Sequence, residues 1–158
     1  MNTFLIGIDE AGRGPLAGPV ALGLCAVSSP KILKLFKGVK DSKQLSEAQR
    51  EEWFVCIKAA AKTGDLAYVV TLASNTTIDT KGLSWAIKSA LARGLKRLEK
   101  KGVPCASSQI LLDGSLYAPK KYTHQKTIIG GDASQPIIAL ASICAKVTRD
   151  RLMKRKAK

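Results

Sequence analysis

Four acidic residues are the strongest candidates for chemistry in this sequence: Asp9, Glu10, Asp113 and Asp132. The three aspartates each come shortly after an apolar segment and stand near glycine or alanine, so we expect them in loops just beyond strand ends. Mg²⁺ and Mn²⁺ prefer oxygen ligands, and two such ions held about 3.5 to 4 Å apart can hydrolyse phosphodiesters. Gathered at one place, these acids predict a metal-dependent nuclease.

Each acid taken alone has a simpler interpretation, as a solvated loop residue or as the N-cap of a helix. The four together are a different case, because carboxylates that pack without cations raise one another's pKa values through repulsion. Their proximity would therefore itself be an argument for bound metal.

The elements that must position the acids can be read from the apolar pattern. Five short strands are predicted, over residues 4–9, 20–27, 66–73, 109–112 and 126–129. Glycines and prolines crowd the connection between the first two strands, so its backbone is tight and can approach a ligand closely. We expect an α/β fold with a mixed central sheet flanked by helices, in which ligands bind beyond the strand ends.

Three segments predict helices. Ser46 has the chemistry of an N-cap for a helix that runs to about Lys62. From about Thr80 to Lys100, leucine and isoleucine recur at helical spacing and form one apolar stripe. A proline suited to the first turn precedes a final helix over residues 137–153.

The charge of the chain favours a polyanionic partner. Lysine and arginine number 26 against 12 aspartate and glutamate, which gives a formal net charge of +14. Nucleic acid is the first choice, because a basic surface releases the counterions of the phosphate backbone. A merely basic surface is the alternative. The length suits a single domain over residues 1–158.

The cysteines do not predict a zinc site, since Cys25, Cys56, Cys105 and Cys144 form no Cys-x-x-Cys pair and His124 is the one histidine. Their apolar neighbours predict buried reduced thiols, which favours a reducing compartment. The first residues lack the features of a secretory signal, and no apolar run approaches membrane-spanning length. We therefore expect a cytoplasmic monomer without membrane contact.

Several motifs carry a resemblance to a known family. The segment Gly7 to Val20, which reads Gly-Ile-Asp-Glu-Ala-Gly-Arg-Gly-Pro-Leu-Ala-Gly-Pro-Val, resembles the signature of ribonuclease HII, the type 2 ribonuclease H of bacteria. Four further segments agree with that family in order and spacing: Asp41–Ser46, Leu112–Gly114, Gly130–Ala133 and Ala141–Asp150. The resemblance extends from Ile6 to about Met153.

This resemblance implies a ribonuclease H-like fold, Mg²⁺ or Mn²⁺ as cofactor, and endonucleolytic cutting of RNA. The substrates implied are RNA·DNA hybrids and duplex DNA containing single ribonucleotides, cut 5′ to the ribonucleotide to leave 3′-hydroxyl and 5′-phosphate ends. Matched motif to motif, the four acids take the family's metal-binding positions.

The same match gives the loop Gly12-Arg13-Gly14 the family's ribose-sensing role. That role makes physical sense, because glycines expose backbone groups and a 2′-hydroxyl both donates and accepts hydrogen bonds. The alternative for this loop is a tight turn that needs glycine for a positive φ.

Four other residues are candidate substrate contacts. Lys146 and Arg149 are three residues apart, share a helix face and could both meet a phosphate backbone; Lys43 is a third candidate cation. Solvated surface charge is the alternative for each. Ser142 could face the bound strand or be a buried small residue. For Tyr117 and Tyr122 we expect loop packing rather than stacking on a base, and for the lone histidine a place on a surface loop.

The chain departs from the family at its C-terminal end. Family members continue beyond the Arg-Asp-Arg-Leu-Met segment into a helical region with a tyrosine that packs on a deoxyribose, whereas no tyrosine follows Tyr122 here. We therefore expect a C-terminally short catalytic domain. One alternative is a weakly active or inactive nucleic-acid-binding module of the same fold. Another is a resolvase or transposase that acts on DNA alone, against which Arg13 between its glycines argues.

Overall fold

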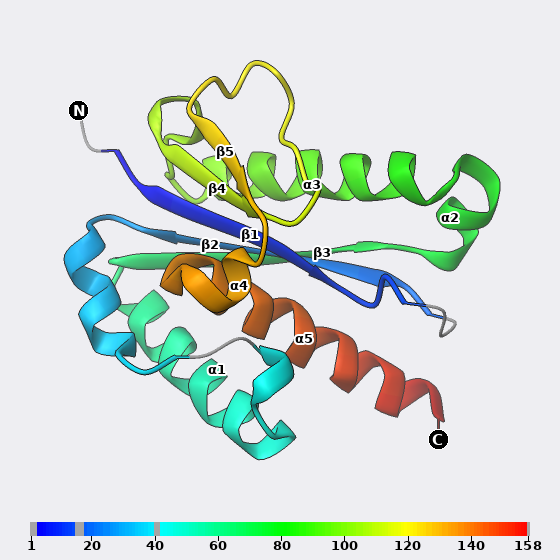
Figure 1. The fold of residues 1–158 in the computed structure, drawn as a ribbon, viewed down its shortest axis with the longest axis horizontal. Coiled ribbons are helices and arrows are strands. Elements are labelled where there is room, and N and C mark those ends of the chain that lie inside the picture. Colours follow the sequence, from blue (N-terminus) through cyan, green and yellow to red (C-terminus); the bar gives the residue numbers. More distant parts are fainter. Residues whose placement is uncertain (1–2, 15–17, 40–41, 158) are drawn as a thin grey trace.

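A five-stranded mixed sheet forms the centre of the molecule (Figure 1). The computed structural model describes residues 3–14, 18–39 and 42–157. In the order β3-β2-β1-β4-β5, β2 is antiparallel to both β3 and β1, whereas β4 is parallel to both β1 and β5. The strands are β1 (Leu5–Ala11), β2 (Val20–Val27), β3 (Leu66–Ala73), β4 (Gln109–Asp113) and β5 (Gln125–Ile128). All five predicted strands are present, with bounds shifted by at most two residues.

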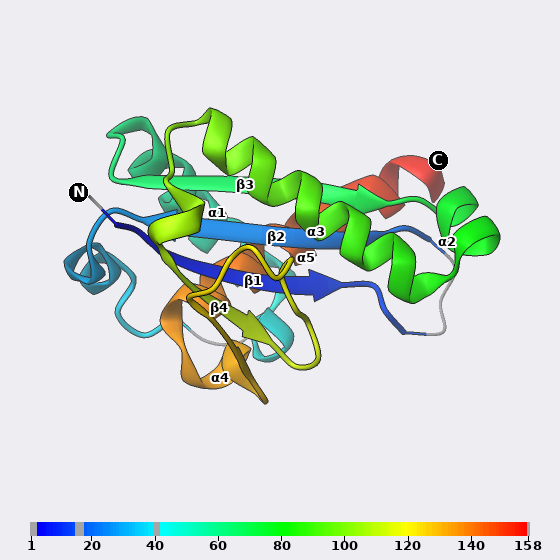
Figure 2. The same cartoon turned by 90° about the horizontal axis from the view of Figure 1, so that it is seen from above.

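Helices cover both faces of the sheet (Figures 1 and 2). On one face α5 lies across β1 and β2, with α1 beside it, and on the other face α3 packs on β2 and β3. The helices are α1 (Glu47–Lys62), α2 (Asn75–Lys81), α3 (Leu83–Lys100), α4 (Gly131–Ser134) and α5 (Pro136–Ala157), with short 3₁₀ turns at Pro30–Phe36, Ser42–Gln44 and Cys105–Ser107. Ser46 caps α1 as expected, and Gln49 completes the capping box.

The segment predicted as one helix from Thr80 to Lys100 is two helices. Ser74 caps the polar helix α2, and Gly82, with φ of 90°, separates it from α3. The apolar stripe therefore identified α3 correctly but gave no sign of α2, which buries no side chain completely.

Two glycines allow α5 to lie directly on the strands. A Cβ placed on Gly7 of β1 would come within 2.4 Å of the carbonyl oxygen of Ile137, and one on Gly23 of β2 within 2.1 Å of that of Ala141. Such distances leave no room for a side chain, so only glycine permits this approach. The contact fixes α5 against the strand that carries Asp9 and Glu10.

The environments of the cysteines and tyrosines were predicted only in part. Cys25, Cys105 and Cys144 are buried, but Cys56 is exposed because it lies on the outer side of α1. Tyr122 is buried, and its hydroxyl donates a hydrogen bond to Glu99 Oε1 at 2.8 Å, as loop packing requires. The packing prediction for Tyr117 is wrong, since 66% of this residue is exposed. Across the described part of the chain, no helix combines the length and apolarity needed to cross a bilayer.

Candidate metal centre

Three of the four predicted acids meet where β1 and β4 run side by side. The parallel pairing ends with Ile8 opposite Leu112, so Asp9 and Asp113 are the next residues of their strands. One carboxylate oxygen from each of Asp9, Glu10 and Asp113 lies within 4.8 Å of the other two. The topology of the sheet thus joins residues that are far apart in the sequence.

The expectation that the aspartates stand in loops beyond strand ends needs correction. Asp9 and Glu10 lie inside β1, paired with Gly23 and Leu22 of β2. Asp113 is the last residue of β4. The two acids of β1 still border an open edge, because β1 continues beyond the point where its pairing with β4 stops.

Asp132 approaches the cluster from a different element. It lies in the single turn of α4 rather than in a loop, after Gly130, whose φ of 67° turns the chain out of β5. The backbone N–H of Asp132 donates to Asp113 Oδ1 at 3.1 Å. The residue is 8% exposed, and its charge contributes to the raised pKa of Asp9. All four predicted acids therefore lie in one neighbourhood.

The cluster is electrostatically strained without a counter-charge. Burial raises the pKa of Asp9 from 3.8 to about 9, and the nearby carboxylates of Asp113, Glu10 and Asp132 add to the rise. A hydrogen bond of 2.8 Å from the backbone N–H of Glu10 to Asp9 Oδ1 opposes it. At neutral pH the isolated site therefore favours a proton on Asp9, a position that a divalent cation could take instead.

The residues present fit a hard divalent cation. Among the described residues, Glu10 Oε2 is buried and has no hydrogen-bond partner, which is costly for a carboxylate oxygen that binds nothing. The donor set consists of carboxylate oxygens, without a histidine or cysteine in the three-residue cluster. Such donors suit Mg²⁺ or Mn²⁺ and not structural zinc.

The Gly-Arg-Gly loop is tied to both acid-bearing strands. Arg13 Nη1 lies 3.5 Å from Glu10 Oε1 and donates to Ser115 Oγ at 3.1 Å. Gly12 has a φ of 96°, so the tight-turn interpretation describes its backbone. Gly14 is exposed. Ser115 was not among the residues predicted from the sequence to lie at the site, although its position two residues after Asp113 indicates that it lies near that acid.

The side chain of Arg149, on α5, packs against the backbone of this loop. Arg149 is 7% exposed, its Nε donates to the carbonyl oxygen of Pro19 at 3.0 Å, and its side chain lies against Gly12 and Gly18. Arg149 is therefore not a solvated surface charge, whereas Lys146, three residues earlier on α5, is partly exposed. The direct contact of Arg149 with a phosphate stays a prediction, which this burial disfavours.

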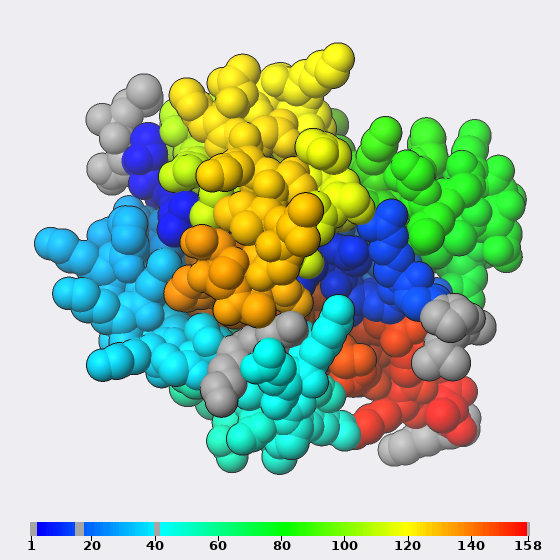
Figure 3. Space-filling model, viewed as in Figure 1, coloured from blue at the N-terminus to red at the C-terminus, as the bar shows by residue number. Residues whose placement is uncertain are grey.

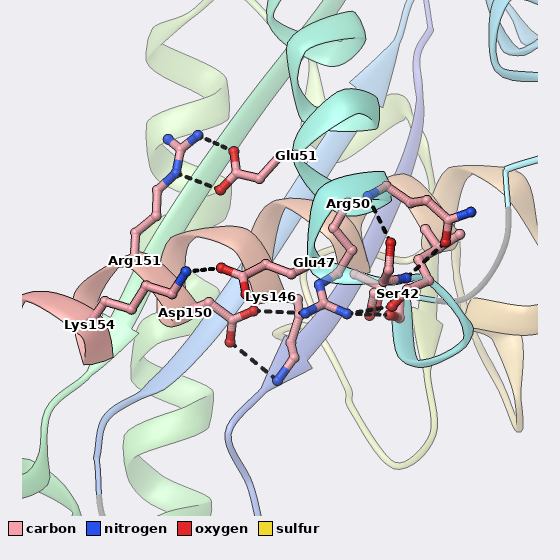
Figure 4. A network of polar contacts seen from close by, with 12 residues as sticks. Ser42, Glu47, Arg50, Glu51, Lys146, Asp150, Arg151 and Lys154 are labelled. Carbon is pink, nitrogen blue, oxygen red and sulfur yellow. Dashed lines mark hydrogen bonds and ion pairs between the residues drawn. The ribbon is translucent and has the colours of Figure 1, made fainter. Parts of the chain in front are cut away.

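A second loop, Ser42–Ser46, is also tied to α5 (Figure 4). Ser42 Oγ and Ser142 Oγ are 2.7 Å apart, and Ser142 is buried. Arg50 donates to the carbonyl oxygens of Ser42 and Leu45 and pairs with Asp150 at 3.1 Å.

The two remaining candidate cations, Lys146 and Lys43, lie near the contact between the loop Ser42–Ser46 and α5. Lys146 pairs with Asp150 at 3.4 Å, and Lys43 is an exposed residue of the same loop. Both therefore lie near the anchored loop, and their contacts with a substrate stay predictions. Asp41 and the stretch 15–17 of the two motifs lie outside the described residues.

Comparison with known proteins decides the family. The profile of ribonuclease HII matches residues 6–158. The chain belongs to the ribonuclease HII family. It is 39% identical over 161 residues to a ribonuclease HII of Clostridium botulinum, covering 99% of this chain and 55% of that relative.

Solved structures confirm the ribonuclease H-like fold. A ribonuclease H2 from Pyrococcus horikoshii is 32% identical with a TM-score of 0.66, and the match covers 99% of this chain and 77% of that one. Bst-RNase HIII, solved in complex with Mn²⁺, is 23% identical with a TM-score of 0.74, covering 98% of this chain and 54% of that one, and shares the fold. The chain spans little more than half the length of the Clostridium ribonuclease HII.

Proposed function

We propose that this chain is an endoribonuclease that hydrolyses the RNA strand of RNA·DNA hybrids and cuts 5′ to single ribonucleotides in duplex DNA. The observation that carries the proposal is the convergence of Asp9, Glu10 and Asp113 within 4.8 Å, beside the Gly-Arg-Gly loop. Membership of the ribonuclease HII family supports it. We further propose that residues 1–158 form one domain that acts as a cytoplasmic monomer.

The proposed cofactor is Mg²⁺ or Mn²⁺, held by Asp9, Glu10, Asp113 and Asp132. Bound by these acids, such ions would supply activation of a water molecule and stabilisation of the leaving oxygen. The products we propose carry 3′-hydroxyl and 5′-phosphate ends. The protein's own contribution is to hold the carboxylate ligands in fixed orientations. The hydrogen bond from Asp132 N–H orients Asp113, and that from Glu10 N–H orients Asp9. Because both carboxylates are held by backbone donors, their geometry does not depend on flexible side chains.

Recognition of ribose is assigned to the Gly-Arg-Gly loop. Arg13 is engaged by Glu10 and Ser115, so the backbone around Gly12 and Gly14 is held next to the acids. A 2′-hydroxyl placed there can exchange hydrogen bonds with that backbone, whereas deoxyribose offers no such group. This would confine cleavage to ribonucleotides, and the net charge of +14 would supply attraction that is independent of sequence.

The deciding experiment uses labelled duplex DNA that contains one ribonucleotide, with an all-DNA duplex of the same sequence as control. In Mg²⁺ or Mn²⁺ we expect one nick 5′ to the ribonucleotide and none in the control. Binding of the duplex without nicking would show a nucleic-acid-binding module instead. Equal cutting of both duplexes would show a nuclease that does not read ribose.

A further inference from the structure

We propose that a trough between α3 and the loop of residues 115–120 holds the sugar-phosphate strand that leaves the cleavage site on one side. Two cavities define this α3 trough, of about 50 and about 460 Å³. Both are lined by Lys88 of α3 and by Tyr117, so the two cavities adjoin at these side chains. The inference rests on the proposed function, because the occupant is the flanking part of the same substrate.

The α3 trough begins at the metal centre. Arg13 and Ser115 line its smaller cavity, and they are hydrogen-bonded to each other. Arg13 also pairs with Glu10, and Ser115 follows Asp113 by two residues. In Figure 3 the blue surface of the N-terminal part of the chain shows between the yellow and the green surfaces. A strand whose scissile phosphate sits at the acids can therefore continue directly into the α3 trough.

The lining has the charge and the ring that a nucleic-acid strand requires. Lys88 and Lys120 are exposed cations, and Arg13 is the cation at the entrance. Among the described residues, no acid lines either cavity. Tyr117 is 66% exposed on the rim. Lysine neutralises phosphates and an exposed aromatic ring stacks on a base or sugar. A third cavity of about 300 Å³, which Arg13 also lines, includes the acid Asp79 and does not include Lys88 or Tyr117, so it is not part of the α3 trough.

The outer wall of the α3 trough is held in shape before anything binds. The side chain of Gln125 accepts from the N–H of Ala118 and donates to the carbonyl oxygens of Ala118, Pro119 and Tyr122. Thr127 Oγ1 donates to the carbonyl oxygen of Leu116 at 2.6 Å. A wall fixed in this way loses little conformational entropy on binding, which is the behaviour of a preformed binding surface. The exposure of Tyr117 is thus a stable feature of this loop.

The test compares the parent chain with Lys88→Ala/Tyr117→Ala on three fluorescent duplexes that contain one ribonucleotide. One duplex has long flanks, one lacks the 5′ flank and one lacks the 3′ flank. Binding is measured by anisotropy in Ca²⁺, and nicking separately in Mg²⁺. We expect the variant to bind the long duplex about tenfold or more weakly, because a stacking contact and a phosphate contact are lost. We also expect the loss to vanish on the one shortened duplex that no longer reaches the α3 trough.

Two control variants isolate the trough. Lys96→Ala removes the same charge from an exposed position of α3 outside these cavities, and Lys88→Arg/Tyr117→Phe keeps charge and ring. Both should bind like the parent chain, and all variants should unfold at the same temperature because the changed side chains are exposed. Unchanged affinity of the double alanine variant, or an equal loss on all three duplexes, would overturn the inference. If the parent chain does not nick the duplex in Mg²⁺, that result would count against the proposed function alone. The binding measurement in Ca²⁺ does not require cleavage and would still test the α3 trough.

Discussion

Arg149 occupies the space that any side chain at Gly12 would need. A Cβ built on Gly12 would lie 1.9 Å from Arg149 Nε, and the same guanidinium group is held by the carbonyl oxygen of Pro19. The helix α5 and the Gly-Arg-Gly loop therefore form one unit, in which an arginine that looks like a phosphate contact in the sequence acts as a buried support.

This relationship predicts the effect of Gly12→Ala. The substitution combines a φ of 96° with a collision against a buried side chain, so the loop must move. We expect a loss of about 1 to 3 kcal/mol in the free energy of unfolding and a large loss of cleavage. Gly14→Ala is the matched control for stability, because a Cβ there meets no atom of the described residues within 4 Å. Chemical denaturation and the nicking assay measure the two effects, and equal behaviour of the variants would contradict the argument.

Arg149→Met should separate loop support from metal binding. It keeps much of the side-chain volume but removes the donor to Pro19. We expect the affinity for Mn²⁺, measured by calorimetry, to remain near that of the parent. The preference for cleavage at a ribonucleotide over a deoxyribonucleotide should fall by about tenfold, because a displaced loop would lose a hydrogen bond to the 2′-hydroxyl, worth roughly 1.4 kcal/mol. A variant that keeps full preference would show that the loop does not depend on this support.

The metal-free protein should lose stability as the pH rises. The pKa of Asp9 is raised from 3.8 to about 9, so between these values the folded state binds a proton that the unfolded state has released. The stabilisation is complete below pH 3.8 and is lost as the pH approaches 9, with a slope of at most about 1.4 kcal/mol per pH unit. Denaturation in EDTA at pH 5 and pH 8 measures this difference.

Two further measurements test the cause of that slope. Asp9→Asn should flatten the dependence, because an amide does not titrate, and Mg²⁺ or Mn²⁺ should stabilise the parent chain most at the higher pH. A slope that persists in Asp9→Asn would assign the effect to another group.

Asp113→Asn should abolish cleavage while leaving the affinity for hybrid in Ca²⁺ nearly unchanged. The amide keeps the shape and can still accept the N–H of Asp132, but it removes a charged ligand from the cluster. The basic surface that attracts the substrate remains. Retained full activity in Mg²⁺ would show that the ligand assignment is wrong.

The ion pairs between α1 and α5 should differ in their contribution to stability (Figure 4). Asp150 pairs with Arg50, whose Nε is buried without a partner among the described residues. Asp150→Ala would therefore leave a largely buried cation bound only to the carbonyl oxygens of Ser42 and Leu45. We expect a loss of about 2 to 3 kcal/mol. Glu51→Ala, which breaks the more exposed pair with Arg151, should cost less than about 1 kcal/mol. Equal losses in denaturation would contradict the distinction.

The strands and the helix α3 could be predicted because their apolar patterns have a clear period. The continuation of β1 past Asp9 to Ala11 could not, because it depends on pairing with β2, and a strand's own sequence does not show where that pairing ends. The gathering of Asp113 with Asp9 depends on the parallel pairing of β1 and β4, a contact between distant segments. The burial of Arg149 likewise depends on which loop packs over α5, and helical spacing alone carries no information about that.

The absence of side chains at Gly7 and Gly23 has a mechanical consequence. Where a helix rests on a sheet through side chains, rotamer changes let the two layers slide past each other. Here the carbonyl oxygens of Ile137 and Ala141 lie directly against the strand backbones, so no side-chain layer separates α5 from β1 and β2 at these two points. Because Arg149 and Ser142, which contact the two loops, both lie on α5, we expect the acids and these two supports to keep their relative positions when substrate binds.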